Sequence, residues 1–294
     1  MTTLERRYRR LLLAYPRTYR ATHGDELLDV LLESAGPGQS VPAAREALGL
    51  IFGGARARIV HLATGSTWAD GLHLGITAVS AANLAVLLPY ATTLPWWTLL
   101  SALALLAVLR GRLWAALALT ALTGVKAVAI AGGWRLFDLT LVPVLPTFLT
   151  GDALFGASSP VVVAFAYAVV LLGLLALTRR GGPVRLRSWW WWSAVPPLAW
   201  AGPAWMPDGT QYPISLSRLA VEVVVFALAV VAAYVTRDLR WTLASGIYLL
   251  VASAGLSLHA DSMTRQHIAY WGVLTLLVLG AAVAPFRQRG RCLD

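Results

Sequence analysis

Basic residues alternate with long apolar runs along this chain of 294 residues, and this pattern restricts the fold more than any other feature. Twenty of the 24 lysine and arginine residues fall in short segments beside those runs. A helix needs roughly 20 apolar residues to cross the hydrocarbon core of a bilayer, and short cytoplasmic loops keep an excess of basic residues. The sequence therefore predicts an all-α, polytopic protein of the plasma (inner) membrane, with both termini in the cytoplasm.

Charge density divides the chain into regions. Only 13% of all residues are charged, against about 25% in a typical soluble domain, yet the first 66 residues carry charge as a soluble protein does. The formal net charge of +10 lies mostly beside apolar runs, where arginines meet anionic lipid headgroups. We therefore expect the lipid bilayer, and no nucleic acid, as a partner. The predicted regions are a cytoplasmic helical domain at 1–66, a transmembrane bundle at 67–287 and a short basic cytoplasmic tail at 288–294.

Eight membrane spans are predicted from the apolar runs. The segment 136–155 is also apolar, but Pro143 and Pro146 argue against a ninth span there. A ninth span would also move the basic segment 179–187 to the outer side, so we expect 136–155 to be interfacial or re-entrant. The eight predicted spans are about Leu72–Tyr90, Leu94–Leu109, Leu113–Gly132, Pro160–Leu177, Trp189–Met206, Leu219–Val235, Trp241–Leu258 and Ile268–Phe286.

Three short helices are predicted in the N-terminal region. The first has one apolar face at helical spacing, from Leu4 to Tyr15, and Pro16 bends or ends it. Gly24 is expected to break the chain, so that a second, acidic helix begins at Asp25. The third is expected at about Val41–Phe52, with Gly53-Gly54 as its end. A domain of this size is marginally stable alone, so we expect it to need a protein partner, a second copy or the membrane surface.

The same region carries the run Tyr8-x-x-Leu11-Leu12-x-x-Tyr15-Pro16-x-x-Tyr19-Arg20-x-x-His23-Gly24-Asp25-Glu26-Leu27-Leu28. This run resembles the prefix domain found ahead of some bacterial ABC-exporter permeases and at the head of stand-alone actinobacterial integral membrane proteins. The resemblance covers about 35 residues, and up to 65 with the third helix. It implies a cytoplasmic adaptor or regulatory module rather than a reaction. The chain departs from exporter permeases downstream, because no long outer segment separates its spans.

Charged residues inside membrane spans are costly and are therefore candidates for function. Lys126 in the third predicted span and Glu222 in the sixth lie at similar depths near the outer end, so one hypothesis pairs them inside the membrane. The alternative pairs Glu222 with Arg218, four residues earlier, while Lys126 extends toward the outer headgroups. The spacing leaves both pairings open.

Several other polar and aromatic features allow two interpretations, one structural and one functional. Pro196 and Pro197 lie near the middle of the fifth predicted span and are candidates for a hinge or a cavity lining. The structural alternative is a tolerated kink. The four tryptophans at 189–192 favour an interfacial belt over an aromatic cage. His259, Asp261 and His267 share the outer face, but their spacing matches no metal-binding signature.

No nucleotide-binding, hydrolase or zinc motif occurs in the sequence, so we expect no enzymatic activity, no cofactor and no bound metal. The leading hypothesis is a regulatory or sensory membrane protein that acts through its N-terminal helices, which would bind a cytoplasmic protein or a second copy. The alternative is a transporter or export component with an intramembrane polar site at Lys126 and Glu222. A membrane-embedded enzyme using the outer-face group that includes Asp208 ranks last.

Overall fold

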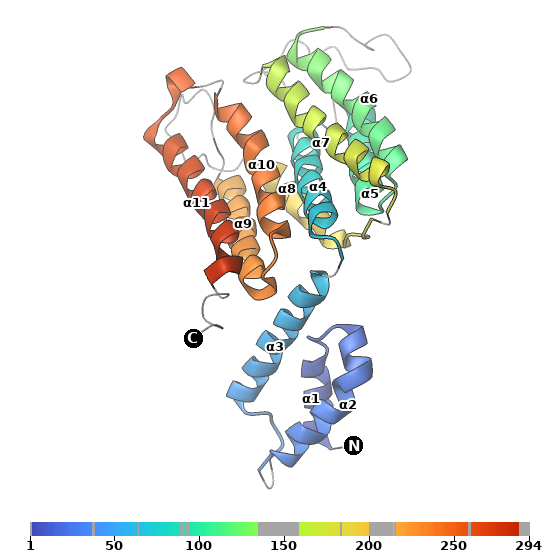
Figure 1. Cartoon of the computed structure of the whole chain (residues 1–294), viewed down its shortest axis with the longest axis vertical. Coiled ribbons are helices and arrows are strands. Elements are labelled where there is room, and N and C mark those ends of the chain that lie inside the picture. The colour runs from blue at the N-terminus through green and yellow to red at the C-terminus, as the bar shows by residue number, and fades with distance from the viewer. Residues whose placement is uncertain are drawn as a thin grey trace. The chain divides into compact units, whose positions relative to one another are not determined.

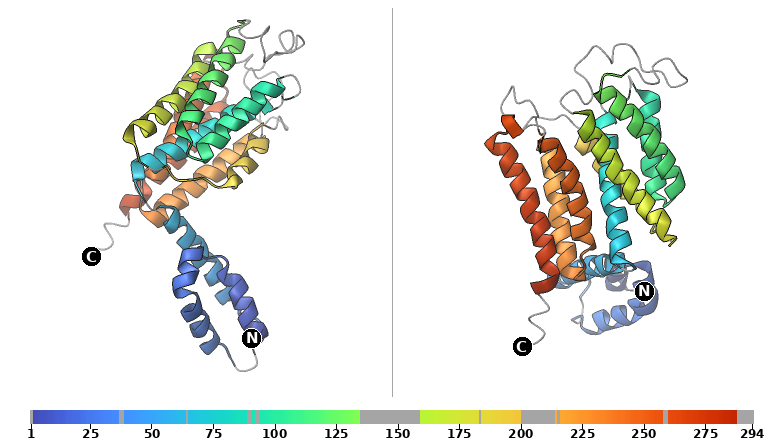
Figure 2. Two further views of the ribbon diagram at one scale, coloured as in Figure 1. Left: turned by 90° about the vertical axis from the view of Figure 1, so that its right-hand side faces the viewer. Right: turned by 45° about the horizontal axis from the view of Figure 1, so that its top comes forward.

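The computed structural model of the chain describes residues 2–36, 39–63, 65–88, 91, 94–134, 159–182, 184–199, 214, 216–257 and 260–287. The secondary structure of these residues is helical, with no strand among them. Two compact units make up the chain, of which the first contains residues 1–65 and the second nearly all of the remainder (Figures 1 and 2). Several sequence predictions lie outside the described residues, namely those on the segment 136–155, Asp208, His259 and the tail 288–294.

Three helices form the N-terminal unit: α1 (Thr3–Leu12), α2 (Arg17–Glu33) and α3 (Ala44–Leu62). The Thr2 hydroxyl begins α1 by accepting a hydrogen bond from the Glu5 amide. Pro16 separates α1 from α2 and occupies the position before the first helical residue of α2. Both α2 and α3 pack on α1. The buried core of this unit consists of Leu4, Tyr8, Leu12, Leu28 and Leu50.

Glycine does not end the helices of this unit, and the predicted boundaries there are wrong. Helix α2 runs through Gly24, so it begins eight residues before the predicted start at Asp25. Helix α3 continues through Gly53 and Gly54 to Leu62. A Cβ atom on Gly54 would lie 2.6 Å from the Cβ and 2.8 Å from the carbonyl carbon of Ala14. Gly54 is therefore a contact point between α3 and the end of α1, rather than a helix stop.

The second unit contains the apolar helices (Figure 1). Five of them are long and apolar enough to cross a membrane, as judged by length and composition. This confirms the prediction of a helical membrane protein. The five are α4 (Thr67–Leu87), α6 (Leu113–Ala131), α7 (Pro160–Arg180), α9 (Leu216–Thr236) and α11 (Arg265–Arg287).

Two further helices coincide with predicted spans but fall short of the same criteria. Helix α5 (Pro95–Leu109) is apolar and has 15 residues, which corresponds to a length of about 22 Å. Helix α10 (Arg240–Ser257) has 18 residues but begins with an arginine.

The fifth predicted span differs most from the structure. Residues Trp189–Ala194 form a 3₁₀-helix, η3, and Val195–Ala199 form a short α-helix, α8. The remainder of that predicted span, including Pro203, lies outside the described residues. Pro196 and Pro197 occupy the first turn of α8 rather than the middle of a long helix, which suits residues without a backbone N–H group.

Helix α4 is the centre of the second unit and packs on α5, α7, α8 and α10. Two glycines bring its backbone close to α10, because a Cβ on Gly71 would lie 2.8 Å from the Arg240 carbonyl oxygen and one on Gly75 would lie 2.8 Å from the Ile247 side chain. Small residues at helix contacts are typical of membrane bundles, where packing replaces the hydrophobic effect. The outward faces of α7, α9 and α11 expose apolar residues such as Leu172, Leu228 and Leu276, as lipid contact requires.

Substitution of Gly54 by alanine should weaken the N-terminal unit, because the new methyl group meets the Ala14 backbone. We expect a loss of about 1–3 kcal/mol of local stability, measured as faster hydrogen exchange of α3 in the full-length protein. The matched control is Gly49→Ala, where no atom lies within 4 Å of the added Cβ. This variant should stabilise α3 by up to about 1 kcal/mol, and equal exchange in both variants would contradict the contact.

Candidate functional site

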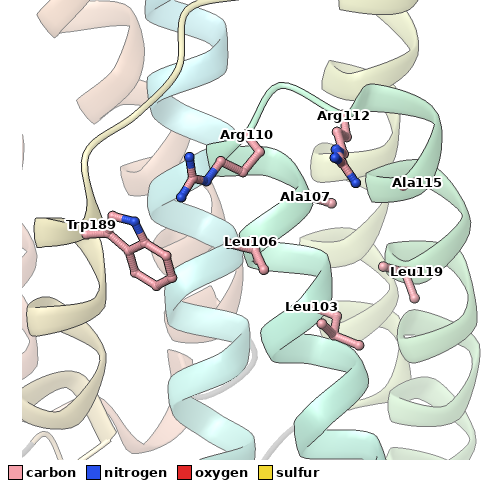
Figure 3. Close-up of a pocket in the computed structure, with 8 residues that line it drawn as sticks. All are labelled: Leu103, Leu106, Ala107, Arg110, Arg112, Ala115, Leu119 and Trp189. Carbon is pink, nitrogen blue, oxygen red and sulfur yellow. The ribbon is translucent and has the colours of Figure 1, made fainter.

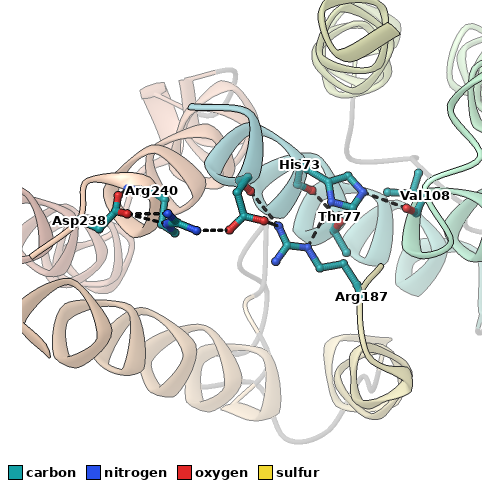
Figure 4. A network of polar contacts seen from close by, with 7 residues as sticks. His73, Thr77, Val108, Arg187, Asp238 and Arg240 are labelled. Atoms are coloured by element: carbon teal, nitrogen blue, oxygen red, sulfur yellow. Dashed lines mark hydrogen bonds and ion pairs between the residues drawn. The ribbon is translucent and has the colours of Figure 1, made fainter. Parts of the chain in front are cut away.

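Two buried polar clusters lie among the apolar helices of the second unit. The first, the Asp70 network, joins the start of α4, the segment before η3 and the start of α10 (Figure 4). Its members are Asp70, His73, Arg187, Asp238 and Arg240.

The Asp70 carboxylate is held by two arginines. Arg187 donates from Nη2 to Oδ1 at 2.5 Å and to the Asp70 carbonyl oxygen at 2.9 Å. Arg240, whose side chain is fully buried, donates from Nη1 to Oδ2 at 2.8 Å. Asp238 accepts from Nε of Arg240 at 2.8 Å, so that two carboxylates balance two guanidinium groups. Buried charges are tolerated when they are paired and hydrogen-bonded in this way.

His73 extends the network toward α5. Its Nδ1 accepts from Nε of Arg187 at 3.2 Å, and its Nε2 lies 2.9 Å from the Val108 carbonyl oxygen. Because Nδ1 accepts and a carbonyl can only accept, the proton lies on Nε2 and the ring is neutral. Burial lowers the pKa of Arg187 from its ordinary value, while the Asp70 carboxylate opposes that shift. Each of these polar atoms has a partner, so the network ties the start of α4 to α5, to the segment before η3 and to the start of α10.

The second cluster, the Glu222 cluster, joins α9, α10 and α11. Its members are Arg218, Glu222, Tyr248 and Tyr270. Glu222 Oε1 accepts from Nε of Arg218 at 2.9 Å and from the Tyr248 hydroxyl at 2.5 Å, and Oε2 accepts from the Tyr270 hydroxyl. The Glu222 side chain is 2% exposed, whereas that of Arg218 is 28% exposed. This is a carboxylate with three donors inside a set of apolar helices, which makes it a candidate proton or cation site.

The structure brings Glu222 together with Arg218, which is one of the two pairings that the sequence left open. Lys126 is buried in α6, with its ammonium nitrogen 5.8 Å from the centroid of the Trp97 ring. Helix α6 packs on α5 and α7, and the contacts of Glu222 named above come from other helices. An ion pair between Lys126 and Glu222 stays a prediction.

The predicted N-terminal motif separates into core and surface residues. Tyr8 is buried and donates its hydroxyl to Glu46 Oε2 at 2.6 Å. Burial and this carboxylate raise the pKa of Tyr8 from 10.0 to about 12, so the hydroxyl stays protonated and donates. Tyr15 packs against Gly53 and stacks on Tyr19 at 5.1 Å between ring centroids.

The rest of the motif lies along α2. The His23 ring lies 5.1 Å from the Tyr19 ring, and His23 Nδ1 lies 3.7 Å from Glu26 Oε2. Asp25 and Glu26 are exposed, and Arg20 is half-buried. Tyr8 and Tyr15 therefore fix the fold of the unit, while the acidic residues are available to solvent.

Sequence reasoning missed the arginine partners of Asp70 and the tyrosine partners of Glu222. Arg187 and Arg240 were visible only as loop charges that set topology. That topology itself carried a signal, because it places Asp70, Arg187 and Arg240 at the same membrane face. Tyr248 and Tyr270 gave no comparable signal, since tyrosine in an apolar helix is ordinary.

The described residues contain no group of three or more His, Cys, Asp or Glu placed to hold a metal ion. Of the residues predicted to share the outer face, Asp261 is exposed in η4 (Ala260–Ser262). His267 is buried, and its Nδ1 accepts from the Thr264 amide at 3.1 Å.

Removal of the Asp70 charge should destabilise the second unit, because Asp70→Asn leaves two buried guanidinium groups around a neutral amide. Breaking a buried ion pair costs about 3–5 kcal/mol, so we expect the apparent Tm of the full-length protein in mild detergent to fall by more than about 6 °C. The matched control, Asp261→Asn, removes an exposed carboxylate and should leave the apparent Tm within about 1 °C. Equal shifts in the two variants would show that the network does not hold the helices together.

Comparison of the chain with protein-family models, with curated proteins and with solved structures finds no match.

Proposed function

We propose that this chain is a polytopic protein of the plasma (inner) membrane, with eight spans and cytoplasmic termini, that acts in regulation or sensing by binding a soluble cytoplasmic protein through its N-terminal unit. Five apolar helices support the membrane location, and the distribution of arginines supports the orientation. The single observation that carries the binding role is an apolar face on α3. This face consists of Leu48, Ile51 and Phe52.

The α3 face is exposed although the unit has its own core. Phe52 is 71% exposed and Leu48 is 54% exposed, while the core of the unit uses Leu50 on another side of the same helix. Residues 48, 51 and 52 lie on one side of a helix because they are spaced by three and four positions. Clustered apolar residues on the surface mark interaction sites.

The charges beside the α3 face select the partner. Arg45 and Arg56 lie within one turn of it and are exposed. An apolar helix lies well against such a face, and acidic residues along its edges would pair with the two arginines. We therefore assign the face to an amphipathic helix with acidic flanks on a soluble protein. The resemblance of the N-terminal run to a prefix domain agrees with an adaptor role.

The test uses the full-length protein purified in mild detergent after cross-linking in cells. A partner that contacts the face should cross-link near Phe52, and its capture should fall at least about tenfold in Leu48→Ser/Phe52→Ser. The matched control is Val30→Ser, which removes an exposed apolar side chain from α2. Purified partner should then bind wild type and Val30→Ser alike, with much weaker binding to the double variant.

Other occupants of the α3 face would overturn the assignment. The chain has a single cysteine, so Phe52→Cys in a Cys292→Ser background gives one labelling site. Disulfide cross-linking between two copies at position 52 would assign the face to a homodimer. Quenching of a fluorophore at this site by lipid-borne spin labels would assign it to the membrane surface. If Leu48→Ser/Phe52→Ser captured the partner as well as wild type does, the α3 face would have no role in binding.

The Glu222 cluster favours a second function, proton-coupled transport or export. Protonation of a buried carboxylate would release Arg218 and alter the contacts among α9, α10 and α11, which is the kind of coupling that carriers use. The pairing of Glu222 with Arg218, Tyr248 and Tyr270 is the observation behind this candidate.

Proton flux tests this second function. In proteoliposomes with an internal pH dye and an imposed membrane potential, wild type should acidify the lumen faster than empty vesicles. Glu222→Gln should reduce that rate to the background, because the amide cannot take up a proton, while Asp261→Asn should retain it. The proposal of proton transport through Glu222 would be wrong if wild type gave the same proton flux as empty vesicles, or if Glu222→Gln kept the full flux.

A further inference from the structure

A cavity between α5 and α6 combines an apolar floor with two arginines at its edge (Figure 3). Its volume is about 540 Å³, within the range of roughly 300–1,000 Å³ that ligand sites occupy. It lies at the turn that joins the two helices and shares no lining residue with either polar cluster. The lining residues are Leu103, Leu106, Ala107, Arg110, Arg112, Ala115, Leu119 and Trp189.

The floor of the cavity is hydrocarbon. Leu103, Leu106 and Ala107 are spaced by three and four positions, so they form one stripe along α5, and Leu119 faces them from α6. Both helices are predominantly apolar. Leu103 remains 40% exposed, so the stripe is open to an apolar chain that lies along the helices.

The edge of the cavity is cationic. Arg110 and Arg112 flank Gly111, whose φ of +64° makes the tight turn between α5 and α6. The guanidinium carbon of Arg110 lies 5.3 Å from the centroid of the Trp189 ring, a cation–π contact that orients the group and leaves its N–H edges available. Within the described part of the chain, neither arginine has a carboxylate partner.

We propose that this cavity binds one anionic phospholipid, with the phosphate at the cationic edge formed by Arg110 and Arg112 and an acyl chain along Leu103, Leu106 and Leu119. Basic groups beside a groove between membrane helices recognise anionic headgroups, and arginine suits phosphate because its N–H groups match the phosphate oxygens. A free phosphate would leave the apolar stripe uncovered, whereas a neutral lipid would leave two arginines without an anion. An anionic amphiphile satisfies both parts of the site.

Native mass spectrometry of the detergent-purified, full-length protein tests the site. We expect dioleoyl phosphatidylglycerol to bind at least about tenfold more tightly than dioleoyl phosphatidylcholine. The variant Arg110→Gln/Arg112→Gln should lose that preference. The matched control is Arg179→Gln/Arg180→Gln, which also removes two exposed arginines, one of them 6.0 Å from the Trp68 ring, and should retain the preference.

A second variant separates the acyl chain from the phosphate. Leu103→Trp fills the groove from an exposed position and should weaken phosphatidylglycerol binding at least about fivefold while both arginines remain. Full binding by this variant would show that the groove holds no chain. Displacement of the lipid by millimolar inorganic phosphate would reassign the site to a soluble anion. If both double arginine variants lost the preference for phosphatidylglycerol equally, the preference would come from general surface charge, and the site would be rejected.

Discussion

The second unit depends on one buried carboxylate. Asp70 stands at the first turn of its most buried span, α4, and its two oxygens are shared between Arg187 and Arg240. The contact allows a fully buried arginine to begin α10, and α10 in turn approaches α4 closely enough that Gly71 and Gly75 have no room for a side chain. The close packing of these helices therefore requires the charges of the network to remain balanced.

Local patterns in the sequence predicted the features that depend on neighbouring residues, namely the ends of helices and contacts within one helix. The apolar runs bounded by arginines gave the ends of α6, α7 and α9 to within about three residues, because length and polarity alone fix where a helix can enter a membrane. The pairing of Arg218 with Glu222 was available for the same reason, since residues four positions apart meet on a helix surface. Tyr248 and Tyr270 approach Glu222 from other helices, and no local pattern carries that information.

The errors at Gly24, Gly53 and Gly54 have one physical origin. Glycine weakens an isolated helix by about 1 kcal/mol, which made a helix end the natural expectation. In the folded unit, Gly54 allows α3 to approach Ala14, and a contact with a distant residue outweighs the local cost. The same principle applies at η3, where packing of Val195 beside α4 and α5 accompanies a 3₁₀-helix at residues for which an apolar run suggested an α-helix.

The Asp70 network also constrains the order in which the protein can mature. Arg187 and Arg240 follow Asp70 by 117 and 170 positions. At about 5–20 residues per second, synthesis of α10 lags that of α4 by roughly 10–30 s. Until Arg187 has been made, α4 carries a carboxylate without either counter-charge, and the second guanidinium group arrives only with Arg240. The final burial of Asp70 must therefore wait for the last third of the chain. A polypeptide truncated before Arg187 would therefore present an unneutralised acid at the start of its first long apolar helix, a mark by which membrane quality control could recognise an unfinished chain.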